Sequence, residues 1–378
     1  MTTRTPDRTL PKISGPDELV QAIPYLLGFH AVDSLVLVGL DDGRVVVTAR
    51  IDLADAFVRG ALAYTLQGMR AGGAECFVAV IYGDVPDEDM DEDVGTDAYA
   101  LPHSEIVGDL IDAADECDAV VTELVLVADG RWWSYLCAEP ECCPPEGHPI
   151  HNDCAFAAEA TFAGIAVERD RQALASSLDP LSESERRRLM PHISTAEAEA
   201  TRLVLRGESE TRQRSVKRAL FAAVRRCDRE AARGVTPVLD DEDLVRFVVA
   251  LREIDVRDPL WMAVDDGRVD GRAMWMELAR RAPSPYDAAP MFLYGWACWR
   301  AGNGALARMA ADRAITSDPD YSAADLLLGA LAAAVDPRRF PKLRAPRTRG
   351  TRNRVDRDLR DPHEDVIADE SVEGDARC

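Results

Sequence analysis

The sequence predicts a mixed α/β domain followed by an all-helical domain. Residues 35–40 and 45–51 are two apolar segments joined by Asp41-Asp42-Gly43, a typical hairpin turn. Strand-like and helical segments then alternate up to residue 128, as they do in βαβ units. From about residue 156 onward, every periodic segment has the 3.6-residue spacing of an amphipathic helix. Together these three observations define the fold class.

The α/β elements can be placed in order along the chain. After a tail at residues 1–15, a helix begins at Pro16 and ends at Gly28, which serves as a left-handed cap. The hairpin follows, with its two strands antiparallel. The remaining predicted segments are a helix at 54–70, a strand at 76–82, a helix at 104–117, a strand at 120–128 and a short returning strand at 131–136. We therefore expect a mixed sheet domain over residues 16–155.

The helical domain is predicted to cover residues 156–335, and a charged, disordered tail is predicted for residues 336–378. If Pro319 closes a 34-residue tetratricopeptide repeat, Gly295, Ala307 and Ala314 fall on its small positions. The aromatic positions do not match, and no second copy precedes it. The end of this domain is therefore either tetratricopeptide-like or an ordinary helical hairpin packed through alanines. Core packing is expected for the six tryptophans, which are Trp132, Trp133, Trp261, Trp275, Trp296 and Trp299.

Composition restricts the partners of this chain. The 378 residues carry a formal net charge of -23, which disfavours nucleic acid and anionic membranes because both attract positive surfaces. The first residues lack the apolar segment of a signal peptide, and the apolar runs are too short to span a bilayer, so we expect a cytoplasmic protein. The nine cysteines then indicate free thiols, a metal or redox chemistry before a disulfide framework.

Standard catalytic signatures are missing from the sequence. It contains no dinucleotide fingerprint, phosphate loop, nucleophile elbow or zinc-protease helix. An acidic stretch at residues 84–97 lacks the glycine and the closing glutamate of an EF-hand loop, which favours a solvated loop. If this protein is an enzyme, its catalytic residues come from segments that are far apart in the sequence.

A first candidate site lies at the open end of the predicted hairpin. Alternation along the strand at residues 45–52 places Arg50 and Asp52 on the same face. His30, Asp33 and Ser34 precede the partner strand and are near this end. The five side chains could bind a ligand, since α/β folds bind ligands at sheet ends. The alternative is an ion pair at a strand end, with Asp33 and Ser34 closing a turn.

A second candidate site is the segment CAEPECCPPEGHPIHNDC at residues 137–154. Cys137, Cys142 and Cys143 are soft ligands in a proline-braced loop, a setting that suits zinc. His148, His151 and Cys154 follow, but no C-x-x-C occurs, and the adjacent cysteines make shared ligation difficult. The alternatives are a redox or vicinal disulfide role and small buried thiols without a metal.

Three separated motifs resemble one family, the actinobacterial domain of unknown function number 4192. The resemblance covers most of residues 13–335. It depends on Pro24, Leu26-Leu27-Gly28-Phe29, Asp33-Ser34-Leu35-Val36, Arg50, Asp52, Trp133-Ser134-Tyr135, Cys137, Cys142-Cys143-Pro144, Gly147, Ala297, Trp299, residues 302–305, Arg313-Ala314 and Asp318-Pro319. The resemblance implies membership without an activity. His148, His151 and Cys154 are not part of the family pattern, which weakens a six-ligand zinc site.

Three functional hypotheses follow from the sequence. The first is a binding or scaffolding protein, whose helical domain offers a groove to a protein partner. The second is an enzyme or small-molecule sensor with its site at His30, Asp33, Arg50 and Asp52. The third is a structural metal or redox centre at the cysteines, with zinc as the candidate metal. The sequence leaves all three open.

Overall fold

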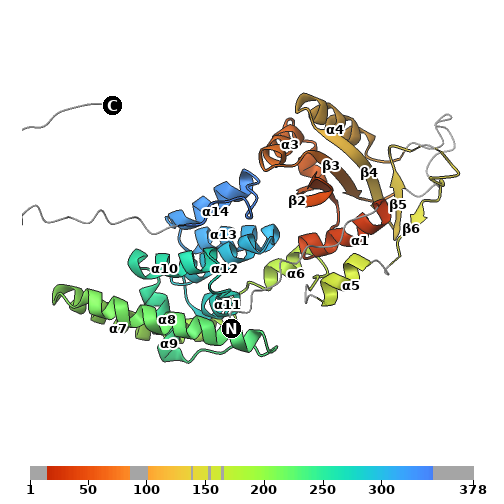
Figure 1. Cartoon of the computed structure of the whole chain (residues 1–378). Helices are drawn as coiled ribbons and strands as arrows, with labels where there is room; N and C mark the ends of the chain where they lie inside the picture. Colours follow the sequence, from red (N-terminus) through yellow and green to blue (C-terminus); the bar gives the residue numbers. More distant parts are fainter. Residues whose placement is uncertain (1–14, 86–100, 138, 152–154, 163–165, 344–378) are drawn as a thin grey trace, which may run out of the picture. The chain divides into compact units, whose positions relative to one another are not determined.

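The computed structural model describes residues 15–85, 101–137, 139–151, 155–162 and 166–343. Residues 1–14 of the predicted N-terminal tail, most of the acidic stretch, Cys154 and the charged tail from residue 344 lie outside these ranges. A mixed sheet with its helices occupies the first part of the chain, and helices alone follow it (Figure 1). The structure thus confirms the predicted fold class.

The sheet has six strands in the order β2-β1-β3-β4-β5-β6 among the described residues. β1 pairs antiparallel with both β2 and β3, while β3 and β4 are parallel and are joined through α4. β5 and β6 continue the sheet in antiparallel register. The strands are β1 Ser34–Asp41, β2 Arg44–Asp52, β3 Cys76–Tyr82, β4 Val120–Ala128, β5 Arg131–Ser134 and β6 His148–Pro149. The predicted hairpin and the predicted βαβ unit are both present.

Helices cover both faces of this sheet. α1 Pro16–Leu27 packs on the face that carries Val36 and Val80, and it ends at Gly28, whose φ of 84° is the predicted left-handed cap. α3 Ala61–Ala71 and α4 Ser104–Glu116 pack on the opposite face (Figure 1). Each face therefore has its own buried apolar layer.

The continuous helix predicted for residues 54–70 is wrong. The structure has a single turn, α2 Leu53–Ala56, and then α3 begins at Ala61. Gly60 stands between them at φ 82°, a left-handed conformation that an α-helix cannot include. The glycine therefore starts a new helix in a different direction.

The rest of the described chain is helical. The helices are α5 Ala155–Phe162, α6 Arg171–Ser176, α7 Glu183–Leu205, α8 Ser209–Ala231, α9 Asp241–Ala250, α10 Ile254–Asp265, α11 Arg272–Arg281, α12 Ala288–Arg300, α13 Gly304–Ser317 and α14 Ser322–Ala332. α12 lies at the centre of this part and contacts α10, α11, α13 and α14. α5 packs against α1, where Tyr25 and Phe156 meet edge to face. None of the described helices is long and apolar enough to cross a bilayer.

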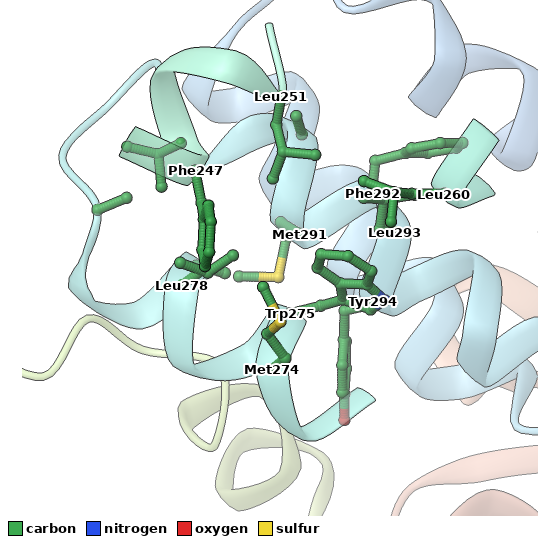
Figure 2. Close-up of a cluster of buried hydrophobic side chains, with 14 of the residues drawn as sticks. Phe247, Leu251, Leu260, Met274, Trp275, Leu278, Met291, Phe292, Leu293 and Tyr294 are labelled. Carbon is green, nitrogen blue, oxygen red and sulfur yellow. The ribbon is translucent and has the colours of Figure 1, made fainter. Parts of the chain in front are cut away.

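The helical core is built from large apolar side chains of α9 to α12. Figure 2 shows Phe247, Trp275, Met291 and Phe292 among the side chains that interlock there, and all four are buried. Trp132, Trp296 and Trp299 are buried as well, whereas Trp133 and Trp261 are half-buried against the cores. The tryptophans thus pack in or against the apolar cores, as the sequence predicts.

The segment after α14 also packs on the helical part. Phe340 contacts Trp296 and Trp299 edge to face, and the backbone N–H of Leu343 donates to Asp265 at 2.7 Å. Residues 336–343, which the sequence assigns to the charged tail, therefore have defined contacts. The division at residue 155 stays a prediction, because residues 15–343 fall into one compact unit.

Candidate functional site

The open end of the β1–β2 hairpin brings the predicted polar residues close together. Ser34 lies opposite Asp52 in the antiparallel register, and Val36 lies opposite Arg50. Asp33 has a φ of 45°, and its carbonyl oxygen accepts from the backbone N–H of Leu53 at 3.0 Å. This turn closes the end of the hairpin. Because directly opposite residues point to the same face, Ser34, Arg50 and Asp52 share the face that α1 covers.

Arg50 and Asp52 form an ion pair. The Nη2 atom of Arg50 lies 2.7 Å from the Oδ1 atom of Asp52 and 3.3 Å from the carbonyl oxygen of Val32. The hydrogen bond from Arg50 lowers the pKa of the Asp52 carboxyl below its ordinary value. The Arg50 side chain is 14% exposed and stands over the ring of Phe29, whereas Asp52 is 57% exposed. The pair thus has one half-buried member and one that faces solvent.

His30 and Asp33 do not join this ion pair. The backbone of His30 pairs with Glu168, and its side chain is exposed. Among the described residues, no hydrogen bond or ion pair connects the side chains of His30 or Asp33 to Arg50 or Asp52. Of the five predicted residues, Ser34, Arg50 and Asp52 therefore lie together on one face, whereas His30 and Asp33 do not contribute side-chain bonds to the ion pair.

A row of polar residues crosses the sheet at this end. Tyr82 lies beside Ser34, and the row continues through Val127 to Trp132 and His148. We call Asp52, Ser34, Tyr82, Trp132 and His148 the polar row. It lies where the parallel strands β3 and β4 reach their carboxyl ends. Sequence reasoning placed Trp132 correctly in the core but did not single out Tyr82 or the row, because neighbours in the row are up to 50 residues apart in the chain and only strand register aligns them.

Several atoms of the polar row are buried and have no hydrogen-bond partner among the residues that the structure describes. They are Oγ of Ser34, OH of Tyr82, Nε1 of Trp132 and Nε2 of His148, together with Nε of the adjacent Arg50. The rings of Trp132 and His148 stack with centroids 4.3 Å apart, and burial raises the pKa of the Tyr82 hydroxyl. A buried polar atom without a partner costs about 1–3 kcal/mol. A ligand that satisfied several of them would recover that free energy.

Three cysteines of the second candidate site converge in the loop between β5 and β6. The Sγ atoms of Cys137, Cys142 and Cys143 all lie within 4.8 Å of one another, and we call these residues the thiol cluster. All three cysteines are free; Cys142 is exposed, and the other two are half-buried. The expectation of buried thiols is therefore wrong for Cys142, because the turn projects it to the surface. The Sγ atoms of the adjacent Cys142 and Cys143 nevertheless both lie close to that of Cys137.

The thiols of the cluster have different acidities. A hydrogen bond to the backbone of Glu139, together with one to the thiol of Cys143, lowers the pKa of Cys137. Burial, together with the neighbouring sulfurs, raises the pKa of Cys143 to about 12. Neither histidine of the segment joins the cluster, since His148 stacks on Trp132 and His151 is exposed. The cluster is thus a set of three sulfur atoms.

The helical part contains a groove whose residues were not predicted from the sequence. It has a volume of about 1090 Å³ and lies between α7, α8 and α9. Its lining residues are Arg188, His192, Thr195, Ala196, Glu199, Ala200, Leu203, Glu208, Thr211, Arg212, Ser215, Val216, Asp241, Glu242, Val245, Arg246 and Val249. We call this the α7–α9 groove. Amphipathic periodicity shows which residues avoid water, but the groove depends on how far apart the helices stand.

The fold and these features define a class of protein: a six-stranded mixed sheet joined to a helical bundle, with a polar row, a thiol cluster and a groove. The profile of the domain of unknown function DUF4192 matches residues 16–338, which is most of the chain, and the protein belongs to that family. The resemblance found in the sequence motifs is thereby confirmed. Neither the comparison with curated proteins nor that with solved structures found a significant match.

Proposed function

We propose that this protein is a binding protein, and that its α7–α9 groove takes a basic, amphipathic helix of a partner protein. The observation that carries the proposal is the groove itself, a hollow of about 1090 Å³ with an apolar floor and a charged rim. Grooves between helices are a common setting for helical peptide recognition, in which apolar side chains at i, i+3, i+4 and i+7 fill the floor.

The dimensions of the groove suit a short helix. The α7 wall runs from Arg188 to Leu203, and a rise of 1.5 Å per residue makes this wall roughly 22 Å long. A partner helix of about four turns has the same length. The floor is formed by small or β-branched residues, among them Ala196, Val216 and Val249. Small side chains there leave room for the larger apolar residues of a partner.

Charge at the rim selects a basic partner. The three arginines that line the groove already have carboxylate partners: Arg188 pairs with Asp241, Arg212 with Glu253 and Arg246 with Asp243. By contrast, Glu199, Glu208 and Glu242 are exposed, and no ion pair within the described residues engages them. Their charge, together with the chain's net charge of -23, attracts positive segments and repels acidic ones.

The test uses two labelled peptides of about 16 residues that share leucines at helical i, i+3, i+4 and i+7 positions. One carries lysines at the other positions, and its matched control carries glutamates. Fluorescence anisotropy with the full chain should show binding of the lysine peptide only. A variant with Ala196→Trp and Ala200→Trp fills the floor and should weaken binding at least about tenfold.

A charge control separates the groove from general attraction to an acidic protein. Replacing Glu199, Glu208 and Glu242 by glutamine should weaken the lysine peptide strongly. The same number of charges removed from the exposed face of α4, by Glu105→Gln, Asp109→Asn and Asp112→Asn, should change the affinity less than about twofold. Equal effects of the two triple variants, or unchanged binding by the filled variant, would refute the groove as the binding site.

A second candidate function is binding of a small oxygen-rich ligand at the polar row. The observation that favours it is the excess of buried donors that lack a partner within the described part of the chain, namely Nε of Arg50, Nε1 of Trp132 and the hydroxyls of Ser34 and Tyr82. Arginine and indole N–H groups only donate, so a ligand with carboxylate or phosphate oxygens is the matching chemistry. Carboxyl ends of parallel strands are also the usual ligand position in α/β sheets.

Thermal shift with inorganic phosphate, succinate and ribose 5-phosphate tests this second candidate. A ligand of the polar row should raise the melting temperature of the native chain in a concentration-dependent way. The variants Tyr82→Phe and Ser34→Ala should abolish that rise, while Tyr64→Phe, an exposed tyrosine of α3, should retain it. The absence of any shift with all three compounds, or shifts that the row variants leave intact, would contradict it.

A further inference from the structure

The thiol cluster is the only group of three or more potential metal ligands that converges within the described residues. Its members come from two parts of the loop between β5 and β6, since Cys137 lies three residues after the end of β5 and Cys142 and Cys143 lie on the turn beyond it. The three sulfur atoms lie within 4.8 Å of one another although four residues separate Cys137 from Cys142. The convergence therefore needs an explanation in the loop itself.

Backbone hydrogen bonds shape the turn that carries two of the thiols. The carbonyl oxygen of Glu139 accepts from the N–H groups of Cys142 and Cys143, at 3.0 Å and 2.7 Å. A second turn follows, in which the N–H of Gly147 donates to the carbonyl oxygen of Pro144 at 2.9 Å. These bonds place both thiols on one side of the loop without help from an ion.

Side chains of β5 attach the same loop to the sheet. Nε1 of Trp133 donates to the carbonyl oxygen of Pro145 at 2.8 Å, and Nη1 of Arg131 donates to the carbonyl oxygens of Glu146 and Gly147. Because the sheet supports both ends of the loop, its thiols are arranged before any ion binds. Prior arrangement of ligands lowers the entropy that binding must overcome.

The spacing and chemistry of the cluster match a thiophilic metal ion. Zinc–thiolate bonds of about 2.3 Å place the sulfurs of a tetrahedral site roughly 3.8 Å apart. The observed separations of up to 4.8 Å need a contraction of at most about 1 Å, which side-chain rotation provides. The exposure of Cys142 also gives an ion a path from solvent.

We propose that Cys137, Cys142 and Cys143 bind one Zn²⁺ ion as thiolates, and that a water molecule completes its tetrahedral coordination. Binding releases three protons from the three thiols, so the centre carries a net charge of -1. Sulfur ligands favour zinc over magnesium and calcium, which require oxygen. This site is separate from the α7–α9 groove, because it lies in the loop between β5 and β6 and shares no residue with the lining of the groove.

Metal analysis of the full chain tests the proposal. Protein purified without chelator should contain one zinc ion per chain, and Co²⁺ in its place should give the absorption of a tetrahedral thiolate site. Each of Cys137→Ser, Cys142→Ser and Cys143→Ser should weaken zinc binding at least about tenfold. The matched control is Cys117→Ser, a half-buried cysteine of the same part of the chain that lies outside the cluster.

A measurement on the native sequence tests the proposal even if the serine variants fail to fold. Zinc should slow alkylation of the three cluster thiols by iodoacetamide and leave the other cysteines unaffected, as read by peptide mass spectrometry. Equal alkylation rates with and without zinc would overturn the proposal. Zinc well below one ion per chain, copper in its place, or a disulfide within the cluster would overturn it as well.

Discussion

Replacement of Gly147 by alanine should release the cysteine loop from the sheet. Gly147 has a φ of 72°, in the left-handed region that favours glycine. An added Cβ would also lie 2.4 Å from Cε2 of Trp133, a ring that is held by its bond to Pro145. The substitution therefore combines backbone strain with a collision against a fixed indole.

The magnitude of each contribution follows from this geometry. A non-glycine residue in the left-handed region costs about 1–2 kcal/mol. Forcing an extra methyl into a packed site adds about 1–3 kcal/mol, because either the indole or the backbone must shift. Together the G147A variant should lose about 2–5 kcal/mol of unfolding free energy, or open the loop locally at a similar cost.

Gly130 supplies the matched control. Its φ of 73° is almost the same, but a Cβ there would meet nothing within 4 Å. G130A should therefore show the strain alone, about 1–2 kcal/mol. Urea unfolding measures the global loss, and hydrogen exchange of the amides of residues 139–147 reports local opening. If the two variants were equally stable and exchanged at equal rates, the reasoning about Trp133 would be refuted.

Three further predictions concern the polar row and the end of the helical part. The pKa of Asp52 lies below its ordinary value of 3.8, so its ion pair stabilises the fold above that pH and this stabilisation is lost as the pH falls. In urea unfolding, D52N should reduce the loss of unfolding free energy at acid pH by less than about 1 kcal/mol, because the pair is partly exposed. A larger reduction would contradict that exposure. D265A removes a buried acceptor and the partner of Arg300, so it should cost about 3–5 kcal/mol and speed hydrogen exchange at Leu343; slow exchange there would show that Asp265 does not hold the segment. Y82F removes a buried hydroxyl that has no partner among the described residues and should leave stability unchanged or raise it by up to about 3 kcal/mol, whereas a loss would reveal a partner.

Local patterns predicted most of the sheet, because strand and helix periodicity and turn chemistry act between near neighbours. The Gly28 cap, the antiparallel hairpin around Asp41-Asp42-Gly43, and the shared face of Arg50 and Asp52 are all read from adjacent residues. The helix at residues 54–70 is the instructive failure. An isolated glycine inside a helical pattern is tolerated in many helices, so the pattern alone cannot tell that Gly60 takes a left-handed conformation.

The candidate sites were less predictable, since each depends on distance in space. Sequence spacing suggested that adjacent cysteines would compete, yet the turn at Glu139 directs both thiols toward Cys137. Tyr82 and Trp132 carried no polar signal, because aromatic residues in strands usually indicate core packing. Only the strand register, which places Tyr82 beside Ser34 and Trp132 beside Val127, shows that their polar atoms share one buried layer.

The sequence by itself determined the fold class, the family, the hairpin with its ion pair and the identity of the three cysteines. These follow from composition and short-range periodicity, which fix what each segment buries. The tertiary structure alone decided the polar row, the convergence of the three sulfur atoms and the α7–α9 groove. Each of these depends on strand register, on the path of a turn or on the separation of helices, and such quantities come from packing between residues far apart in the chain.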